Sequence, residues 1–148
     1  MQHLRVEIVE SAIDHGPLTE EVSSPQSGAV VLFLGITRNH HEGRRVKGLE
    51  YHCYREMALS ELERVAREVA KAHGVSHFVV IHRVGRVDIG EASLAVAAGS
   101  AHRKAALEAT HDFINRLKQD VPIWEREYFE DASVGWVEGA DIKPSQPA

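Results

Sequence analysis

Hydrophobic positions mark three strands in the first third of the chain. In LRVEIVE (4–10), apolar residues recur at every second position, which places them on one face of an extended segment. GAVVLFLGIT (28–37) is a nearly unbroken apolar run that glycines open and close, a pattern typical of a buried strand. VKGLEYHCY (46–54) alternates again. The sequence therefore predicts three strands before residue 55.

Two polar segments separate these strands. Residues 14–27 contain two prolines and predict a loop with one short helical turn at 18–22. RNHHEGRR (38–45) is polar and contains a glycine, so we expect an exposed and mobile loop there.

The period changes to that of a helix from Met57 onward. Apolar residues follow at helical spacing, and Gly74 is a suitable C-terminal stop. A second long helix is predicted for HRKAALEATHDFINRLKQD (102–120), with these residues facing inward: Ala106, Ala109, Phe113, Ile114 and Leu117. It should end at Val121, because Pro122 disfavours helix at the residue before it.

Four later segments read as strands. HFVVIHRVG (77–85) and ASLAVAAGS (92–100) are predicted strands joined by RVDIGE, and IWEREYF (123–129) and GWVE (135–138) follow the second helix. Hairpins outnumber crossovers in this order, which favours the α+β class with a mainly antiparallel sheet and two long helices. We expect a single domain over the 148 residues, with 139–148 as a flexible tail.

Composition narrows the functional classes. Hydrophobic residues make up 43% and charged residues 26% of the chain, which is ordinary for a globular protein. The net charge of −5 disfavours nucleic-acid binding. One cysteine, Cys53, excludes an internal disulfide or a cysteine-rich metal site and fits a reducing compartment. No apolar run approaches the ~20 residues of a membrane span, so we expect a cytoplasmic protein that does not bind membranes.

Basic side chains gather in four places that could carry chemistry: Arg38, His82-Arg83, His102-Arg103 and Lys118. Each also has an ordinary interpretation, because a surface arginine is usually solvated and the helix dipole alone favours a lysine at a C-terminus. His102 and Arg103 begin a predicted helix, with Ser100 as a possible cap. That combination would suit an anion such as phosphate.

Two other features are weaker candidates. The segment NHHE (39–42) lacks the helical spacing that puts metal ligands on one face, so we expect no metal site. Cys53 shares a strand face with Leu49 and Tyr51, which favours a buried structural thiol over a nucleophile.

The stretches GAVVLFLGITR, LEYHCYREMA, IHRVGRVDIGEASLAVAAGSAHR and LKQDVPIWERE occur in an order and spacing that resembles the large, catalytic subunit of molybdopterin synthase. The resemblance runs from about Leu4 to about Trp136. It implies an α/β-hammerhead-like fold and a homodimer at the centre of a heterotetramer. Each large subunit would bind one small ubiquitin-like sulfur carrier. The carrier's C-terminal Gly-Gly thiocarboxylate would deliver sulfur to cyclic pyranopterin monophosphate and form the molybdopterin dithiolene, with no cofactor required.

The resemblance also implies site residues. Arg38, His102 and Arg103 match the family's substrate and anion pocket, and Lys118 matches its essential lysine. These four residues are therefore the candidates for substrate binding and catalysis.

One position departs from the family pattern. Glu125 follows Trp124 where the family usually has a second active-site lysine, and Ala140 lies near a position where many members carry an arginine. Glu125 would place a negative charge beside an anionic tail and a phosphate. Arg126 cannot simply replace the lysine, because neighbouring strand residues point to opposite faces.

Helix length raises a geometric question about the site. His102 and Lys118 are separated by 16 steps, or roughly 24 Å at ~1.5 Å per residue. We therefore expect a composite site at a two-fold interface, unless a break in the helix brings the two residues together within one chain. Two alternatives to the synthase remain: an impaired paralogue that binds the carrier or a pterin phosphate without efficient turnover, and a dimeric anion-binding module with no carrier.

Overall fold

Two β-sheets and two long helices form the architecture, as seen in a computed structural model that describes residues 1–137. Within this range the first sheet has four strands in the order β1-β5-β7-β2, and the second has the order β3-β4-β8-β9 with β6 also paired to β4. The elements are β1 (His3–Val9), α1 (Leu18–Glu21), β2 (Ala29–Ile36), β3 (His40–His41), β4 (Arg44–Cys53), α2 (Arg55–His73), β5 (His77–Arg83), β6 (Gly85–Asp88), β7 (Ala92–Ser100), α3 (Arg103–Asp120), β8 (Ile123–Phe129) and β9 (Val134–Trp136).

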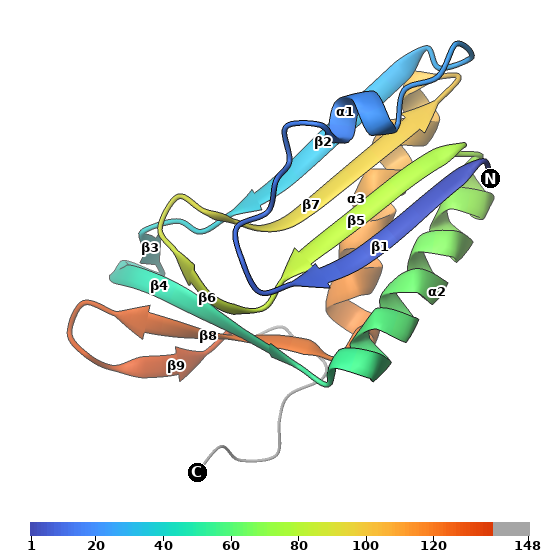
Figure 1. Cartoon of the computed structure of the whole chain (residues 1–148). Helices are drawn as coiled ribbons and strands as arrows, with labels where there is room; N and C mark the ends of the chain where they lie inside the picture. Colours follow the sequence, from blue (N-terminus) through green and yellow to red (C-terminus); the bar gives the residue numbers. More distant parts are fainter. Residues whose placement is uncertain (138–148) are drawn as a thin grey trace.

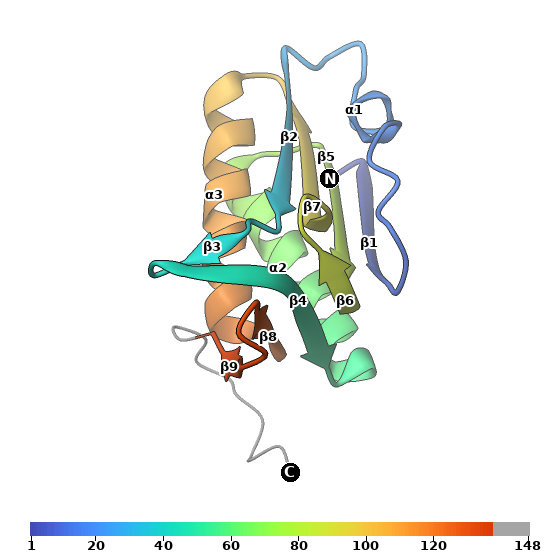
Figure 2. The same ribbon diagram turned by 90° about the vertical axis from the view of Figure 1, so that its left-hand side faces the viewer.

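The first sheet is layered against the helices on one face. Figure 1 shows α2 and α3 side by side behind the sheet, and Figure 2 shows the short α1 on the opposite face. Strands β1 and β5 pair in parallel, whereas the other strand pairs in the described part of the chain are antiparallel. The prediction of an α+β class with mainly antiparallel sheets and two long helices is confirmed.

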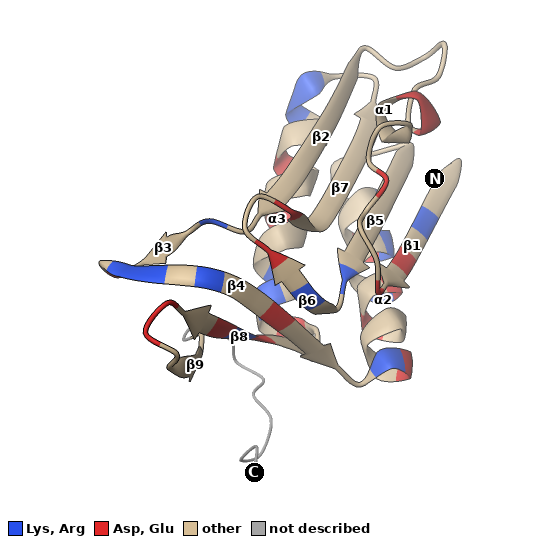
Figure 3. Ribbon diagram, turned by 60° about the vertical axis from the view of Figure 1, so that its left-hand side comes forward, with Lys and Arg blue, Asp and Glu red and all other residues tan. Residues whose placement is uncertain are grey.

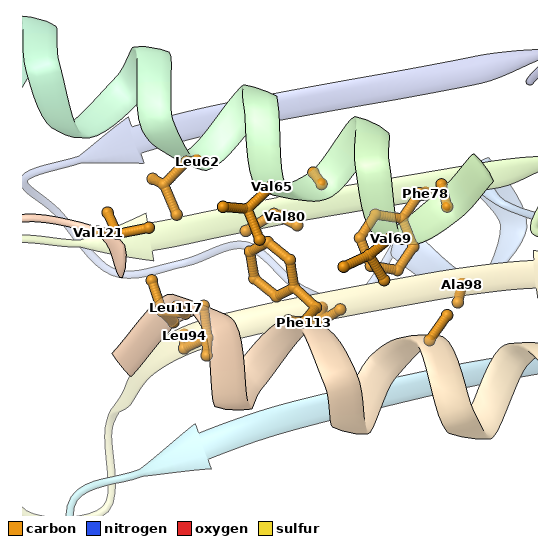
Figure 4. Packing of buried hydrophobic residues seen from close by; sticks show 14 of the residues in the cluster. Leu62, Val65, Val69, Phe78, Val80, Leu94, Ala98, Phe113, Leu117 and Val121 are labelled. Carbon is orange, nitrogen blue, oxygen red and sulfur yellow. The ribbon is translucent and has the colours of Figure 1, made fainter. Parts of the chain in front are cut away.

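The main core lies between the first sheet and the two long helices. Phe78 of β5 and Phe113 of α3 are both fully buried, and their rings meet edge to face with centroids 5.7 Å apart. Figure 4 shows Leu62, Val65 and Val69 of α2 packed into the same cluster. Burial of a side chain of this size contributes about 1.5–3 kcal/mol. This packing positions α3, which carries sequence-predicted site residues at both of its ends.

The predicted helix ends are largely confirmed. Helix α2 begins at Arg55, two residues earlier than expected, and ends at His73. Gly74 caps it with a φ of 74°, the left-handed conformation that glycine adopts readily. Helix α3 ends at Asp120, and Val121 before the proline is extended as predicted. The expected capping role of Ser100 is wrong. Its Oγ donates to the backbone carbonyl of His102 at 2.6 Å and does not accept from a helix N–H.

The loop expected at 38–45 is instead a short hairpin. His40 and His41 form β3 and pair with the first residues of β4. Glu42 and Gly43 make the turn with φ of 51° and 77°, values that fit the two-residue turns preferred in hairpins. The polar composition hid this strand, because β3 is short and has little apolar character.

A second element was also missed in the predicted link between the strands at 77–85 and 92–100. Residues Gly85–Asp88 form β6, which leaves the first sheet and pairs with residues 48–51 of β4. This strand connects the two sheets. The tail expected at 139–148 and the Ala140 position lie outside the described residues, as does the last residue of the strand predicted at 135–138.

None of the helices between residues 1 and 137 has the length and apolar character needed to cross a membrane.

Candidate active site

A cavity of about 500 Å³ opens between the two sheets beside the C-terminal end of α3. The first sheet supplies one wall, and the cavity faces of β4 and β8 supply another. Its chemically relevant lining residues are Arg38, Tyr51, His82, Lys118, Glu125 and Glu127. Four of the residues singled out from the sequence therefore line one cavity: Arg38, His82, Lys118 and Glu125.

Local structure explains why Lys118 reaches the cavity. Leu117 is buried and anchors the last turn of α3, which leaves Lys118 exposed at the cavity rim. The chain then passes through Val121 and the proline and returns as β8. Because β8 starts directly after the helix, its first cavity-facing residues lie opposite Lys118.

His102 and Arg103 lie elsewhere. Both are exposed at the N-terminal end of α3, and neither lines the cavity. Helix α3 is continuous over Arg103–Asp120, so the alternative of a break in the helix is wrong. One chain thus brings together Arg38 and Lys118 but keeps the predicted anion pair about 24 Å away along the helix.

Strand alternation divides the residues of β8 between two faces. Glu125 and Glu127 line the cavity, whereas Arg126 lies on the opposite face. There Arg126 donates to Glu50 Oε1 at 2.6 Å and its guanidinium lies over the Trp136 ring. The expectation that Glu125 and Arg126 point to opposite faces of the strand is confirmed.

The two cavity glutamates differ in their partners. Glu127 is buried, and its Oε1 lies 2.6 Å from His41 Nδ1, an interaction that raises the pKa of His41. Glu125 has no hydrogen bond to its carboxylate from residues 1–137 and no ion pair there with Lys118. Burial raises the pKa of Glu125, although the nearby Tyr51 hydroxyl and Lys118 ammonium oppose part of that rise.

The deeper wall carries uncharged polar groups that the sequence did not single out as a set. Tyr51 Oη donates to Ser93 Oγ at 3.1 Å, and burial raises the pKa of Tyr51. The buried His82 has its Nδ1 2.8 Å from the carbonyl of Arg83, and burial lowers its pKa to about 4. Tyr51 and His82 contact edge to face at 5.2 Å. In the sequence, Tyr51 stood out only as part of an apolar strand face, and His82 only as part of a His-Arg pair.

Positive charge surrounds one side of the cavity. Figure 3 shows basic residues along the first half of β4, and these are Arg44, Arg45 and Lys47. Arg38 precedes the same hairpin and lines the cavity. Arg83, predicted beside His82 as a basic candidate, does not line it and instead pairs with Glu91 at 3.4 Å. An anionic ligand would therefore find its cations at the rim, mainly Arg38 and Lys118.

The weaker candidates have structural surroundings. Cys53 is partly buried against the main core, and burial raises the pKa of its thiol, which makes it a poor nucleophile. No group of three or more metal-ligating side chains comes together within residues 1–137. His41 of the NHHE segment is hydrogen-bonded to Glu127 through its Nδ1.

Comparison with curated proteins places the chain among known relatives. It is 43% identical over 121 residues to the molybdopterin synthase catalytic subunit of Rattus norvegicus, covering 82% of this chain and 60% of the relative. It is 46% identical over 127 residues to the same subunit of Taeniopygia guttata, covering 85% and 81%. The chain spans less than two thirds of the length of the rat and bovine relatives, 60% and 63%.

Solved structures agree with the expected fold. Molybdopterin synthase from Staphylococcus aureus superposes with a TM-score of 0.82 at 33% identity, covering 90% of this chain and 96% of that chain. A protein-protein complex of subunits 1 and 2 of molybdopterin-converting factor from Helicobacter pylori contains a chain with a TM-score of 0.73 at 26% identity, covering 93% and 92%. The family model described as MoaE protein matches residues 8–120. Since that match covers well over half of the sequence, this chain belongs to the MoaE family.

Proposed function

We propose that this protein catalyses the transfer of sulfur from the C-terminal thiocarboxylate of a small ubiquitin-like carrier to cyclic pyranopterin monophosphate, forming the dithiolene of molybdopterin. The observation that carries the proposal is the cavity in which Lys118 and Arg38 meet at the end of α3. Relatives that share 43% and 46% identity bear the name molybdopterin synthase catalytic subunit.

Lys118 is the proposed catalytic residue. The thiocarboxylate sulfur attacks a carbon of the pterin side chain and displaces an oxygen there, which joins the carrier to the pterin as a thioester. Water then attacks the thioester carbonyl, so the carrier leaves as a carboxylate and the sulfur stays on the pterin. The Lys118 ammonium at the cavity rim can donate to the oxyanion that forms during this hydrolysis. The same group can pass a proton to a leaving oxygen on the pterin side chain. Holding the carrier tail and the side chain together supplies much of the rate enhancement. No metal is required for these steps.

Phosphate binding is assigned to Arg38 together with His102 and Arg103. A planar guanidinium can bind two phosphate oxygens at once. Because His102 and Arg103 are remote from the cavity of their own chain, we assign them to the cavity of a second copy. An antiparallel arrangement of two α3 helices around a two-fold axis would bring each N-terminal end to the partner's cavity.

The surface between the two ends of α3 supports such a dimer. Strand β2 is an edge of the first sheet and lies beside α3 (Figure 2). Val30 and Ile36 on β2 and Leu107 on α3 are large apolar side chains that remain exposed. An edge strand flanked by exposed apolar groups is suited to pairing with a second copy.

The carrier is the second proposed partner. It would present a free C-terminal Gly-Gly segment, which is narrow enough to enter the cavity beside Lys118. One carrier on each large subunit would make a heterotetramer, and the Helicobacter pylori complex of two subunits supports this arrangement. A cytoplasmic location fits the free Cys53, because a reducing compartment keeps such a thiol unpaired.

Reconstitution tests the function directly. This protein, a thiocarboxylated carrier and cyclic pyranopterin monophosphate should together yield the dithiolene product, detected after oxidation to a fluorescent derivative. An impaired paralogue would bind carrier or substrate but form no product. A simple anion-binding module would bind phosphate and ignore the carrier.

A further inference from the structure

Three glutamates lie close together on the paired strands β4 and β8: Glu50, Glu125 and Glu127. Within residues 1–137, only the carboxylates of Glu50 and Glu127 have hydrogen-bonded partners. Glu50 accepts from Arg126 at 2.6 Å and Tyr128 at 3.0 Å on the outer face. Glu127 is held by His41 at 2.6 Å on the cavity face. Glu125 also lines the cavity, opposite Tyr51 in the strand register, and apart from the nearby Tyr51 hydroxyl and Lys118 ammonium its carboxylate has no partner among residues 1–137. Among these three glutamates, Glu125 is therefore the one whose carboxylate has no close hydrogen-bonded partner within residues 1–137.

An unpaired carboxylate in such surroundings is unfavourable by itself. Burial raises the pKa of Glu125, and the nearby Tyr51 hydroxyl and Lys118 ammonium offset only part of that rise. Tyr51 lies near, but its single proton is donated to Ser93 Oγ. The Glu125 side chain is only partly buried, and a carboxylate has about four acceptor positions, so most of them stay open toward the cavity. The missing donors of Glu125 are therefore expected to come from a bound molecule.

A second group on the cavity wall also offers an acceptor. His82 Nδ1 lies 2.8 Å from the carbonyl of Arg83, an oxygen that can only accept, so Nδ1 carries the ring proton. Burial keeps the ring neutral at pH 7 by lowering its pKa to about 4. The remaining nitrogen, Nε2, is then an acceptor. The cavity therefore has two hydrogen-bond acceptors on its walls, Glu125 and His82 Nε2. Its cations lie at the rim.

A ligand that satisfies this pattern has N–H donors on a flat ring and negative charge at its far end. The pyrimidine edge of a pterin carries a 2-amino group beside a ring N3–H, and these two donors are parallel. A carboxylate has two oxygens at the matching spacing and accepts such a pair in a bidentate manner. We propose that Glu125 is a substrate-binding residue whose carboxylate accepts from the 2-amino group and N3–H of the pterin.

This inference rests on the proposed function, because it takes the substrate to be a pterin, and it gives Glu125 a role opposite to the one expected from the sequence. A lysine at this position would serve the anionic parts of the reactants. A carboxylate at this position would instead bind the N–H donors of the pterin ring. The departure from the family pattern would then change how the ring is held without removing Lys118 or Arg38.

Binding of two ring compounds provides the test. Pterin has the 2-amino group, whereas lumazine has an oxygen at that position and is otherwise the same bicyclic ring. The dissociation constants of both would be measured by fluorescence for the unaltered protein, for Glu125→Gln and for Glu63→Gln, a matched change on the exposed face of α2. Lys118→Met serves as a further variant that removes the neighbouring cation.

The unaltered protein should prefer pterin by about tenfold or more, since lumazine sets an oxygen against the carboxylate. Glu125→Gln should reduce that preference at least tenfold, because the amide can donate to the lumazine oxygen and accept from its N3–H. Glu63→Gln and Lys118→Met should retain the preference. Folding of each variant would be verified by its circular dichroism and unfolding temperature.

Three outcomes would overturn the inference: an unaltered protein that does not bind pterin, an unaltered protein that binds both rings equally, or a Glu125→Gln variant that weakens both rings by the same factor. The last result would make Glu125 a counter-ion of Lys118. Product formation with the complete system is measured separately. If product forms but the protein binds pterin and lumazine equally, the role of Glu125 is rejected and the proposed function stands. If the protein prefers pterin but forms no product, the role of Glu125 stands and the proposed function is rejected.

Discussion

His102 and Lys118 lie at opposite ends of one uninterrupted helix, 16 residues apart. Helix α3 is continuous over Arg103–Asp120, and the rise of ~1.5 Å per residue separates the two by roughly 24 Å. Lys118 lines the cavity and His102 does not. A small substrate cannot touch both within one chain, so the role proposed for the pair needs two chains.

The first prediction is complementation between two inactive variants. Arg103→Ala and Lys118→Ala should each lose product formation as homodimers. After subunit exchange, a mixed dimer has one site with both lesions and one with neither. Up to half of the dimers in an equal mixture are mixed, and each has one intact site, so activity should recover to about a quarter of the unaltered level.

Native mass spectrometry would verify that exchange has occurred. A confirmed mixed dimer without activity would contradict the composite site, because the fold leaves no other way to join the two ends of α3. As a control, Lys118→Ala mixed with a second Lys118 variant should stay inactive.

The second prediction concerns Lys118 alone. Lys118→Ala should lower product formation by about 100-fold or more, since it removes the donor assigned to the developing oxyanion. Because the side chain is exposed, the unfolding temperature should hardly change. Lys71→Ala, at an exposed position in the last turn of α2, is the matched control. Unchanged turnover in Lys118→Ala would reject the mechanism.

Much of the fold followed from periodicity and from helix-ending residues. The apolar spacing of the two long helices, Gly74 and Pro122 each left a local signal, and each predicted end is close to the observed one. Strands β3 and β6 left no such signal. They are held by pairing with β4, a contact between segments far apart in the sequence.

The site was predicted only in part for the same reason. Arg38 and Lys118 were basic candidates in the sequence, a family resemblance assigned their roles and pointed to Glu125, and the cavity brings the three together. The meeting of Tyr51 and His82 on one cavity wall depends on the gap between two sheets, which no local pattern contains. The unpaired state of Glu125 likewise appears only when its neighbours are known.

The third prediction uses the pH dependence of stability through His82. Burial lowers its pKa from 6.5 to about 4, so between these values the unfolded chain binds a proton that the folded chain does not. Stability should therefore fall as pH falls from about 6.5 to 4, by about 2 kcal/mol between pH 7 and pH 5 from this residue. Urea unfolding of His82→Asn at the two pH values should show a smaller difference. His15→Asn, at an exposed position, should behave like the unaltered protein.

The fourth prediction is that Cys53 takes no part in the chemistry. Because burial raises the pKa of its thiol, alkylation by iodoacetamide should be slow in the folded protein and fast in urea. Cys53→Ala should destabilise the protein by about 1 kcal/mol and leave turnover intact. Loss of turnover in a folded Cys53→Ala variant would show instead that the thiol takes part.

The last prediction separates the two roles considered for Glu125. If the acid only repels the anionic tail and the phosphate, Glu125→Lys should increase kcat/KM, because it adds a cation beside Lys118. If the carboxylate holds the ring, the same change replaces two acceptors with a donor facing the 2-amino group and N3–H. We expect the second result, a KM for cyclic pyranopterin monophosphate at least tenfold higher with little change in the affinity for the carrier. Steady-state assays with each reactant varied in turn make the distinction. A lower KM in Glu125→Lys would show that the acid hinders the substrate.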